Sequence, residues 1–247
     1  MRIAGYTACE YHWLVNLSPE LVTACEAAKQ AVIAASRYLG RRQYHVALAG
    51  NISARVSGEL LVCTCHGADK ETLRREELVL CDLAGRKLEG AGEATSELNM
   101  HREAYRLRPD VHMVVHSHPP AATAFAATST PLDQLQLPEM IVLLGPVCLV
   151  PYATPGSEQL AQDLSPLLRG HDAFLLENHG ALTLGRCARQ AALRMDLLEQ
   201  NARITLMTKQ LGHPFALQAA DMDTLLSFRA RMADWGSEPL PTHENAR

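Results

Sequence analysis

Short apolar segments typical of buried strands recur along this chain at irregular intervals, and this order is the strongest constraint on its fold. Some follow one another directly, and others are separated by segments whose apolar residues have helical spacing. The sequence predicts strands at 52–56, 60–64, 78–82, 111–117, 141–144, 147–150, 173–176 and 181–184. It predicts helices at 19–40, 97–107, 121–127, 156–169, 188–211 and 221–235. This order favours a mixed central sheet between helices over a doubly wound parallel sheet. We therefore expect an α/β fold, with one α/β/α layered domain over residues 1–235 and a mobile tail at 236–247.

The overall composition limits the classes of partner. The 247 residues carry a formal net charge of -4, so no basic surface for nucleic acid is indicated. The most apolar run, 140–150, is interrupted by Gly145 and Pro146 and is shorter than the roughly 20 residues of a membrane span. The first 18 residues lack the apolar core of a signal peptide. We expect a cytoplasmic protein that acts on a small molecule, with no nucleic-acid or membrane partner.

The seven cysteines are odd in number and irregularly spaced, which does not indicate a disulfide framework. Cys63 and Cys65 could form half of a metal site, but no second pair of cysteines follows them. We therefore interpret both as alternate positions along a strand and expect free thiols.

The segment His116-Ser117-His118 ends one predicted strand. Side chains alternate along a strand, so both histidines project to the same side and can bind one metal ion such as zinc. A catalytic zinc usually has a third protein ligand. The candidates for that ligand are His101, His112, His171 and His179. His179 stands out because it lies at a sharp turn between two apolar strands, followed by Gly180, which permits a close approach. The alternative is that the pair only ends a strand.

Glu97 opens the helix that leads into the strand of the paired histidines. A carboxylate near a metal-bound substrate can act as a general base on carbon. The alternative is that Glu97 only stabilises the positive end of the helix dipole. Three segments could bind an anion through backbone N–H groups and hydroxyls, although each could also be a plain turn or cap. These segments are Gly50-Asn51, Gly67 and Thr95-Ser96.

Taken in order, these segments resemble the class II aldolase/adducin family. The matching residues are Gly50-Asn51-Ile52-Ser53, Gly67, Glu71, Leu73, Thr95-Ser96-Glu97, His101, Ala104-Tyr105, Arg108-Pro109-Asp110, Val114-Val115-His116-Ser117-His118, Pro151-Tyr152-Ala153-Thr154 and Asn178-His179-Gly180. The resemblance covers roughly residues 20–212, and the ordered set is highly specific.

The resemblance implies a metal-dependent lyase. Its zinc ligands would be His116, His118 and His179, with manganese or cobalt as possible substitutes. Its catalytic acid/base would be Glu97. The pocket for the substrate phosphate would be lined by Asn51, Gly67, Thr95 and Ser96. Such an enzyme would split a ketose 1-phosphate, such as L-fuculose 1-phosphate, into dihydroxyacetone phosphate and an aldehyde. It would assemble as a homotetramer with sites at subunit interfaces.

The sequence also departs from the family pattern. Family members usually carry Thr-Pro-Ser/Thr-Gly where this chain has Thr64-Cys65-His66-Gly67. They also use tyrosines in proton transfer, whereas this chain has none at 120–150 and none after Tyr152, which leaves Glu139 or water as the donor.

These departures keep one rival reaction open, the decarboxylation of a 3-oxo acid or hydroxylated aromatic acid at the same metal site. A pentulose-phosphate 4-epimerase is less favoured, because such members carry Asp where this chain has Glu97. A non-catalytic, adducin-like module is also less favoured, because all three histidines and Glu97 are present.

Overall fold

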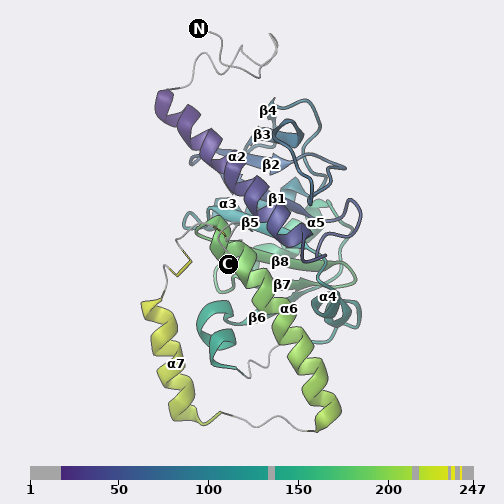
Figure 1. The fold of residues 1–247 in the computed structure, drawn as a ribbon, viewed down its shortest axis with the longest axis vertical. Helices are drawn as coiled ribbons and strands as arrows, with labels where there is room; N and C mark the ends of the chain where they lie inside the picture. The colour runs from purple at the N-terminus through teal and green to yellow at the C-terminus, as the bar shows by residue number, and fades with distance from the viewer. Residues whose placement is uncertain (1–17, 133–136, 213–216, 233–234, 237–239, 241–247) are drawn as a thin grey trace.

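In the computed structural model, one mixed sheet of eight strands forms the centre of the molecule (Figure 1). The structure describes residues 18–132, 137–212, 217–232, 235–236 and 240. The strands are β1 Asn51–Arg55, β2 Leu60–Thr64, β3 Leu78–Asp82, β4 Lys87–Glu89, β5 Met113–Ser117, β6 Val147–Val150, β7 Ala173–Leu176 and β8 Gly180–Gly185. Their order is β4-β3-β2-β1-β5-β8-β7-β6, and every neighbouring pair is antiparallel except the parallel pair β6–β7. The predicted mixed sheet is confirmed.

Helices cover both faces of this sheet. They are α2 Pro19–Gly40, α3 Leu98–Leu107, α4 Pro120–Ala127, α5 Glu158–Leu164, α6 Ala188–Leu211 and α7 Ala219–Arg231, with short 3-10 turns Arg75–Glu77 and Ser165–Leu167. Helices α2, α4 and α6 contribute to the apolar core on one face, and α3 and α5 contribute to the core on the other. The predicted α/β/α layering is therefore confirmed.

Helix α2 shows how local sequence sets the bounds of an element. The Ser18 side chain accepts a hydrogen bond from the backbone N–H of Leu21 at 3.3 Å, and Pro19 occupies the first turn. At the other end, a Cβ atom on Gly40 would lie 2.7 Å from the Cα of Glu71. Glycine thus lets a neighbouring loop approach the last turn of α2.

The predicted strand at 141–144 is wrong. Residues Met140–Leu144 form a π-helix, which we call η2, and the N–H of Gly145 donates to the carbonyl of Met140 at 2.8 Å. A run of four apolar residues fits a buried strand and a buried helical turn equally well. Gly145 decides the outcome because its φ of 80° closes the turn. The sequence also missed β4, a short strand in which two of the three residues are charged.

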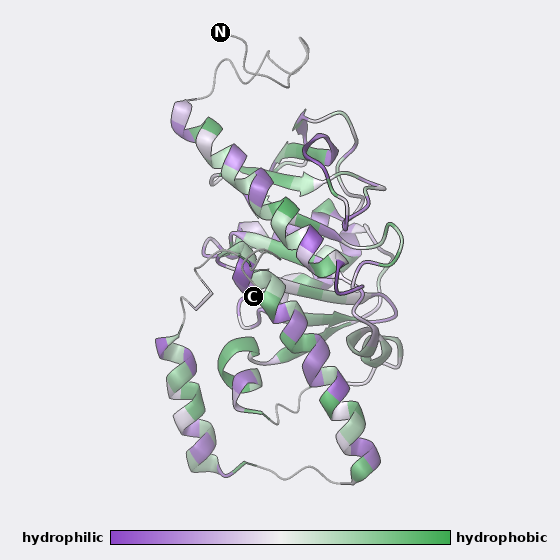
Figure 2. Ribbon diagram, viewed as in Figure 1, coloured by the Kyte–Doolittle hydropathy of each residue, from purple (hydrophilic) through white to green (hydrophobic). Residues whose placement is uncertain are grey.

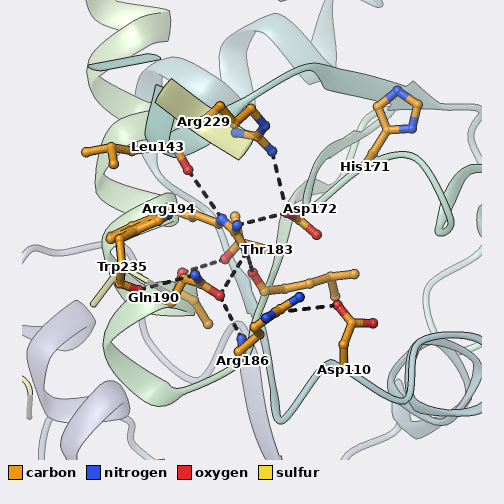
Figure 3. A network of polar contacts seen from close by, with 12 residues as sticks. Asp110, Leu143, His171, Asp172, Thr183, Arg186, Gln190, Arg194, Arg229 and Trp235 are labelled. Atoms are coloured by element: carbon orange, nitrogen blue, oxygen red, sulfur yellow. Dashed lines mark hydrogen bonds and ion pairs between the residues drawn. The ribbon is translucent and has the colours of Figure 1, made fainter. Parts of the chain in front are cut away.

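At the end of the sheet where β5 starts and β8 ends, a network of arginines surrounds Asp172 (Figure 3). Its carboxylate lies 2.9 Å from Arg108, 2.8 Å from Arg194 and 3.6 Å from Arg229. Arg229 belongs to α7 and also donates to the carbonyl oxygens of Ile141 and Val142 in η2. The network therefore joins α7 and η2 to the sheet.

Helix α7 and the C-terminal part of α6 lie at one end of the molecule, where polar and apolar residues are mixed along each helix (Figure 2). Exposed apolar side chains there include Leu206, Met207, Leu211, Leu226 and Phe228. Among the described helices, none is long and apolar enough to cross a membrane. Of the tail predicted at 236–247, only Gly236 and Leu240 are described, so its mobility lies outside the described residues. The extent of a single domain over 1–235 stays a prediction as well.

Candidate metal centre

The paired histidines lie where β5 ends. His116 is the fourth residue of β5 and is fully buried, and His118 follows one residue after the strand. Their Nε2 atoms are 3.0 Å apart. The backbone N–H of His118 donates to the carbonyl of Tyr44 at 2.8 Å, which holds the chain beyond the strand. The period-two prediction that both rings share one side is confirmed.

His179 comes to the same point from the turn between β7 and β8. Its ring centroid lies 4.5 Å from that of His116 and 5.4 Å from that of His118. The turn depends on Asn178, whose φ is 51°. Gly180 is required for a different reason, since a Cβ atom there would lie 2.4 Å from Cδ2 of His118. One potential ligand atom from each of the three histidines lies within 4.8 Å of the others.

The hydrogen bonds and burial of these rings favour metal binding. Nδ1 of His116 lies 2.9 Å from the carbonyl oxygen of Ala181, which places the proton on Nδ1 and leaves a lone pair on Nε2. Burial lowers the pKa of His116 well below its usual value, and burial lowers that of His118 to about 4. Burial lowers the pKa of His179 as well. Neutral imidazoles are the form that binds metal.

The distance of 3.0 Å between Nε2 of His116 and Nε2 of His118 also suits zinc. Nitrogens bound to one tetrahedral zinc lie roughly 3.3 Å apart, given Zn–N bonds of about 2.05 Å. Nδ1 of His179 and Oε1 of Glu97 are buried and have no hydrogen-bond partner among the described residues. Three neutral imidazoles converging beside an incompletely bonded carboxylate fit a catalytic divalent metal.

Glu97 caps the N-terminal end of α3 and is 6% exposed. Its Oε2 lies 3.3 Å from Nε2 of His116, and its Oε1 lies 3.2 Å from Nε2 of His179. The amide of Asn51 donates to Oε2 at 2.7 Å. The structure therefore brings Glu97 beside the histidines, at the distance that an acid/base residue needs to reach a ligand there.

A chain of buried hydrogen bonds fixes this carboxylate from behind. Nε2 of His101 lies 2.6 Å from Oδ1 of Asn51, and Nδ1 of His101 lies 2.7 Å from the hydroxyl of Ser53, which is 2.8 Å from that of Tyr105. The sequence indicated only a candidate ligand or a packing residue at His101. His101 lies four residues after Glu97, and this spacing places both side chains on the same face of the helix, which could have indicated that they are neighbours.

The residues predicted to bind an anion surround one cavity of about 230 Å³. All four of them line it, together with Glu97 and His118: Asn51, Gly67, Thr95 and Ser96. Gly67 has a φ of 76° and open space where a Cβ atom would lie. Lys70 and His66 also line this cavity. Apart from its position three residues after Gly67, no sequence feature indicated Lys70.

The remaining candidates lie elsewhere. His112 is exposed, and Nδ1 of His171 lies 3.0 Å from the carbonyl oxygen of Leu167. Glu139, considered as a proton donor, is exposed ahead of η2 and is not among the residues that line the cavity. His45 was not predicted to have a role, yet its Nε2 lies 2.7 Å from the hydroxyl of Ser117, the residue between His116 and His118.

Solved structures and curated relatives resemble this chain in fold and in sequence. A solved structure of "L-fuculose 1-phosphate aldolase" superposes with a TM-score of 0.75 at 27% identity, covering 81% of this chain and 95% of that one. An L-fuculose phosphate aldolase from Methanococcus maripaludis is 34% identical over 175 residues, 71% of this chain and 94% of that protein. A 3-oxo-tetronate 4-phosphate decarboxylase from Pectobacterium atrosepticum is 32% identical over 168 residues, 66% of this chain and 77% of that protein.

A family profile matches most of the chain. The family described as "Class II Aldolase and Adducin N-terminal domain" matches residues 30–206, a span that contains the sheet, the histidine cluster, Glu97 and the cavity beside them. The predicted resemblance, closest in pattern to L-fuculose-phosphate aldolase, agrees with these relatives. By this match and by the relatives that share its fold, the chain belongs to the class II aldolase and adducin family.

Proposed function

We propose that this chain is a zinc-dependent class II aldolase, a lyase that cleaves a ketose 1-phosphate such as L-fuculose 1-phosphate into dihydroxyacetone phosphate and an aldehyde. One observation carries the proposal. The Glu97 carboxylate lies 3.2 and 3.3 Å from imidazole nitrogens of a three-histidine cluster, beside a cavity lined with anion-binding groups. The names of the relatives from Methanococcus and among solved structures support the same reaction.

His116, His118 and His179 would hold the metal ion. When bound, a divalent cation would polarise the carbonyl oxygen of the substrate as a Lewis acid. Zinc suits three imidazoles, and manganese or cobalt could substitute for it. Glu97 is then the acid/base. In the direction of synthesis it removes a proton from the carbon next to the carbonyl of dihydroxyacetone phosphate. In cleavage it returns that proton to the same carbon after the carbon–carbon bond breaks.

The hydrogen bonds around Glu97 suit this role. The amide of Asn51 donates to Oε2, whereas Oε1 has no hydrogen-bond donor among the described residues and is available to the substrate. We propose that the second N–H of Asn51, the hydroxyls of Thr95 and Ser96 and the backbone at Gly67 bind the phosphate of the substrate. Hydroxyls, amides and glycine turns are common phosphate donors.

We also propose a homotetramer and a cytoplasmic location. The exposed apolar side chains of α6 and α7 support an oligomer, because Leu211 is 88% and Met207 is 56% exposed in the isolated chain. The described cysteines are all free, as expected in a reducing compartment. Light scattering coupled to gel filtration tests the tetramer, and a monomer at micromolar concentration contradicts it.

The first test of function is an aldol assay. The zinc-loaded protein is mixed with dihydroxyacetone phosphate and a panel of short aldehydes, and the consumption of both is followed. We expect zinc-dependent formation of a ketose 1-phosphate, with the panel ranking the aldehydes. Absence of turnover in protein shown to contain zinc would contradict the aldolase proposal.

A second candidate is a decarboxylase of a phosphorylated 3-oxo acid. The specific observation in its favour is the relative named 3-oxo-tetronate 4-phosphate decarboxylase, which is 32% identical to this chain. The same carbonyl polarisation would serve this reaction, since loss of carbon dioxide also leaves an electron pair on the carbon next to a carbonyl. Release of carbon dioxide from such an acid, without aldol turnover, favours this candidate.

A further inference from the structure

Two lysines in the described part of the chain are almost fully buried, and they have different surroundings. Lys29 is 3% exposed, and its Nζ lies 2.6 Å from Oε1 of Glu89. Lys70 is 2% exposed and donates to the carbonyl oxygen of Leu48. Within the described residues, no carboxylate lies within ion-pair distance of Nζ of Lys70. The positive charge of Lys29 is neutralised inside the chain, and that of Lys70 is not.

A buried charge without a counterion is costly, so the position of Lys70 requires an explanation. Burial lowers the pKa of Lys70, because it disfavours the charged ammonium group. Lys70 lines the cavity of about 230 Å³ that also contains Gly67, Ser96 and His118. An anion bound in that cavity would supply the missing negative charge and would complete the hydrogen bonds of the ammonium group.

Several other groups of the cavity are neutral donors. The hydroxyls of Thr95 and Ser96 and the backbone at Gly67 bind an anion without opposing its charge. Glu97 is the carboxylate among the lining residues, and it faces the histidines. A phosphate dianion in this cavity would therefore have the ammonium group of Lys70 as a cationic partner. Hydrogen bonds to charged groups are stronger than those between neutral groups.

We propose that Lys70 is a substrate-binding residue, whose ammonium group binds the phosphate of the substrate in the cavity beside the histidines. This inference rests on the proposed function only in its use of a phosphorylated substrate. It holds for the aldolase and for the decarboxylase alike, since the relatives of both kinds are named for phosphate esters. It also gives a reason for the departure at Thr64-Cys65-His66-Gly67, because a nearby lysine can compensate for a missing hydroxyl.

The test compares the zinc-loaded wild type with Lys70→Met, in which a neutral side chain of similar length replaces the lysine. Calorimetry with inorganic phosphate measures binding without any assumption about the reaction. We expect the Kd for phosphate to rise about 10- to 100-fold in the variant, as loss of a charged hydrogen bond predicts. We expect Lys70→Arg, which keeps the charge, to lose less than tenfold. If Lys70→Met does not fold, Lys70→Gln replaces it with the same readouts.

Kinetics gives the second readout. In Lys70→Met, kcat/KM for dihydroxyacetone phosphate should fall by the same factor, whereas turnover of unphosphorylated dihydroxyacetone should be unchanged within about threefold. Zinc content should equal that of the wild type. Equal losses for both ketones, or phosphate binding unaffected by the substitution, would overturn the role of Lys70. If phosphate binding depends on Lys70 but no aldol turnover is found, the proposed aldolase fails and the phosphate site stands.

Discussion

Charged side chains lie at both ends of strands β5 and β8, but the two groups differ in their partners. At one end the charged groups pair with each other, and at the other end some buried polar atoms have no partner among the described residues. Where β5 starts, the Asp172 carboxylate contacts Arg108, Arg194 and Arg229, and the arginines also donate to backbone carbonyl oxygens. Where β5 ends, buried polar atoms of Glu97 and His179 have no hydrogen-bond partner among the described residues.

This difference separates structural charges from charges that bind a ligand. Buried polar groups in folded proteins nearly always have partners, so a set without them at one point indicates a missing ligand. Groups whose partners lie within the chain stabilise the fold and bind little else. We therefore expect substitutions at the histidine end to reduce metal binding or activity, and substitutions at the arginine end to reduce stability.

The largest effect is expected for His118→Ala. Removal of one of three metal ligands should abolish metal binding at stoichiometric concentration and lower kcat/KM by more than about 1000-fold, because several kcal/mol of charge stabilisation are lost. Metal content by atomic emission and turnover measure the two effects. His171→Ala is the matched control from the other end of the sheet and should retain both. Full metal content in His118→Ala would remove this residue from the site.

Glu97→Gln should separate chemistry from metal binding. The amide keeps the shape of the carboxylate but cannot accept a proton, so kcat should fall about 100- to 10 000-fold with metal content unchanged. Steady-state kinetics and exchange of the carbon-bound proton of dihydroxyacetone phosphate measure the loss. Glu103→Gln lies on the same helix, is paired with Arg106 and should leave both rates unchanged. Normal proton exchange in Glu97→Gln contradicts the assigned role.

At the arginine end, Asp172→Asn should act on stability alone. Breaking a largely buried ion pair leaves Arg194 and Arg108 without their carboxylate and should lower the free energy of unfolding by about 3 kcal/mol. Chemical denaturation measures the change. Glu93→Gln is the control, because Glu93 is 79% exposed in its pair with Lys87 and such pairs contribute less than about 1 kcal/mol. Loss of metal binding in folded Asp172→Asn would contradict the claim that the arginine end affects stability alone.

Local patterns were sufficient to predict most of the fold and the histidines that converge at one point. The caps at Ser18 and Gly40 bounded α2, and the period of two along β5 placed His116 and His118 on one side. The turn at His179 was found because its neighbours have unusual backbone requirements.

What the sequence missed depends on contacts between distant segments. His101 interacts with Asn51 across 50 positions, and Lys70 donates to Leu48 across a chain reversal. Local patterns gave only weak indications here, because the spacing of His101 from Glu97 and that of Lys70 from Gly67 do not predict these partners. The π-helix η2 was mistaken for a strand because four apolar residues carry no period that separates the two.

The smallest effect is expected for His101. This residue contacts Asn51, which in turn donates a hydrogen bond to Glu97, and it is not one of the three proposed metal ligands. Burial lowers its pKa to about 3, below the usual value of 6.5, so the folded chain holds this ring neutral. The stability that it contributes is fully present above about pH 6.5 and is lost as the pH falls toward 3, because the unfolded chain binds the proton first.

In metal-free protein, His101→Gln should therefore flatten the fall in unfolding free energy between pH 6 and 4 by up to about 1.4 kcal/mol per pH unit. Urea denaturation at several pH values measures this slope. An unchanged slope in His101→Gln would mean that this buried ring takes up a proton without unfolding the chain.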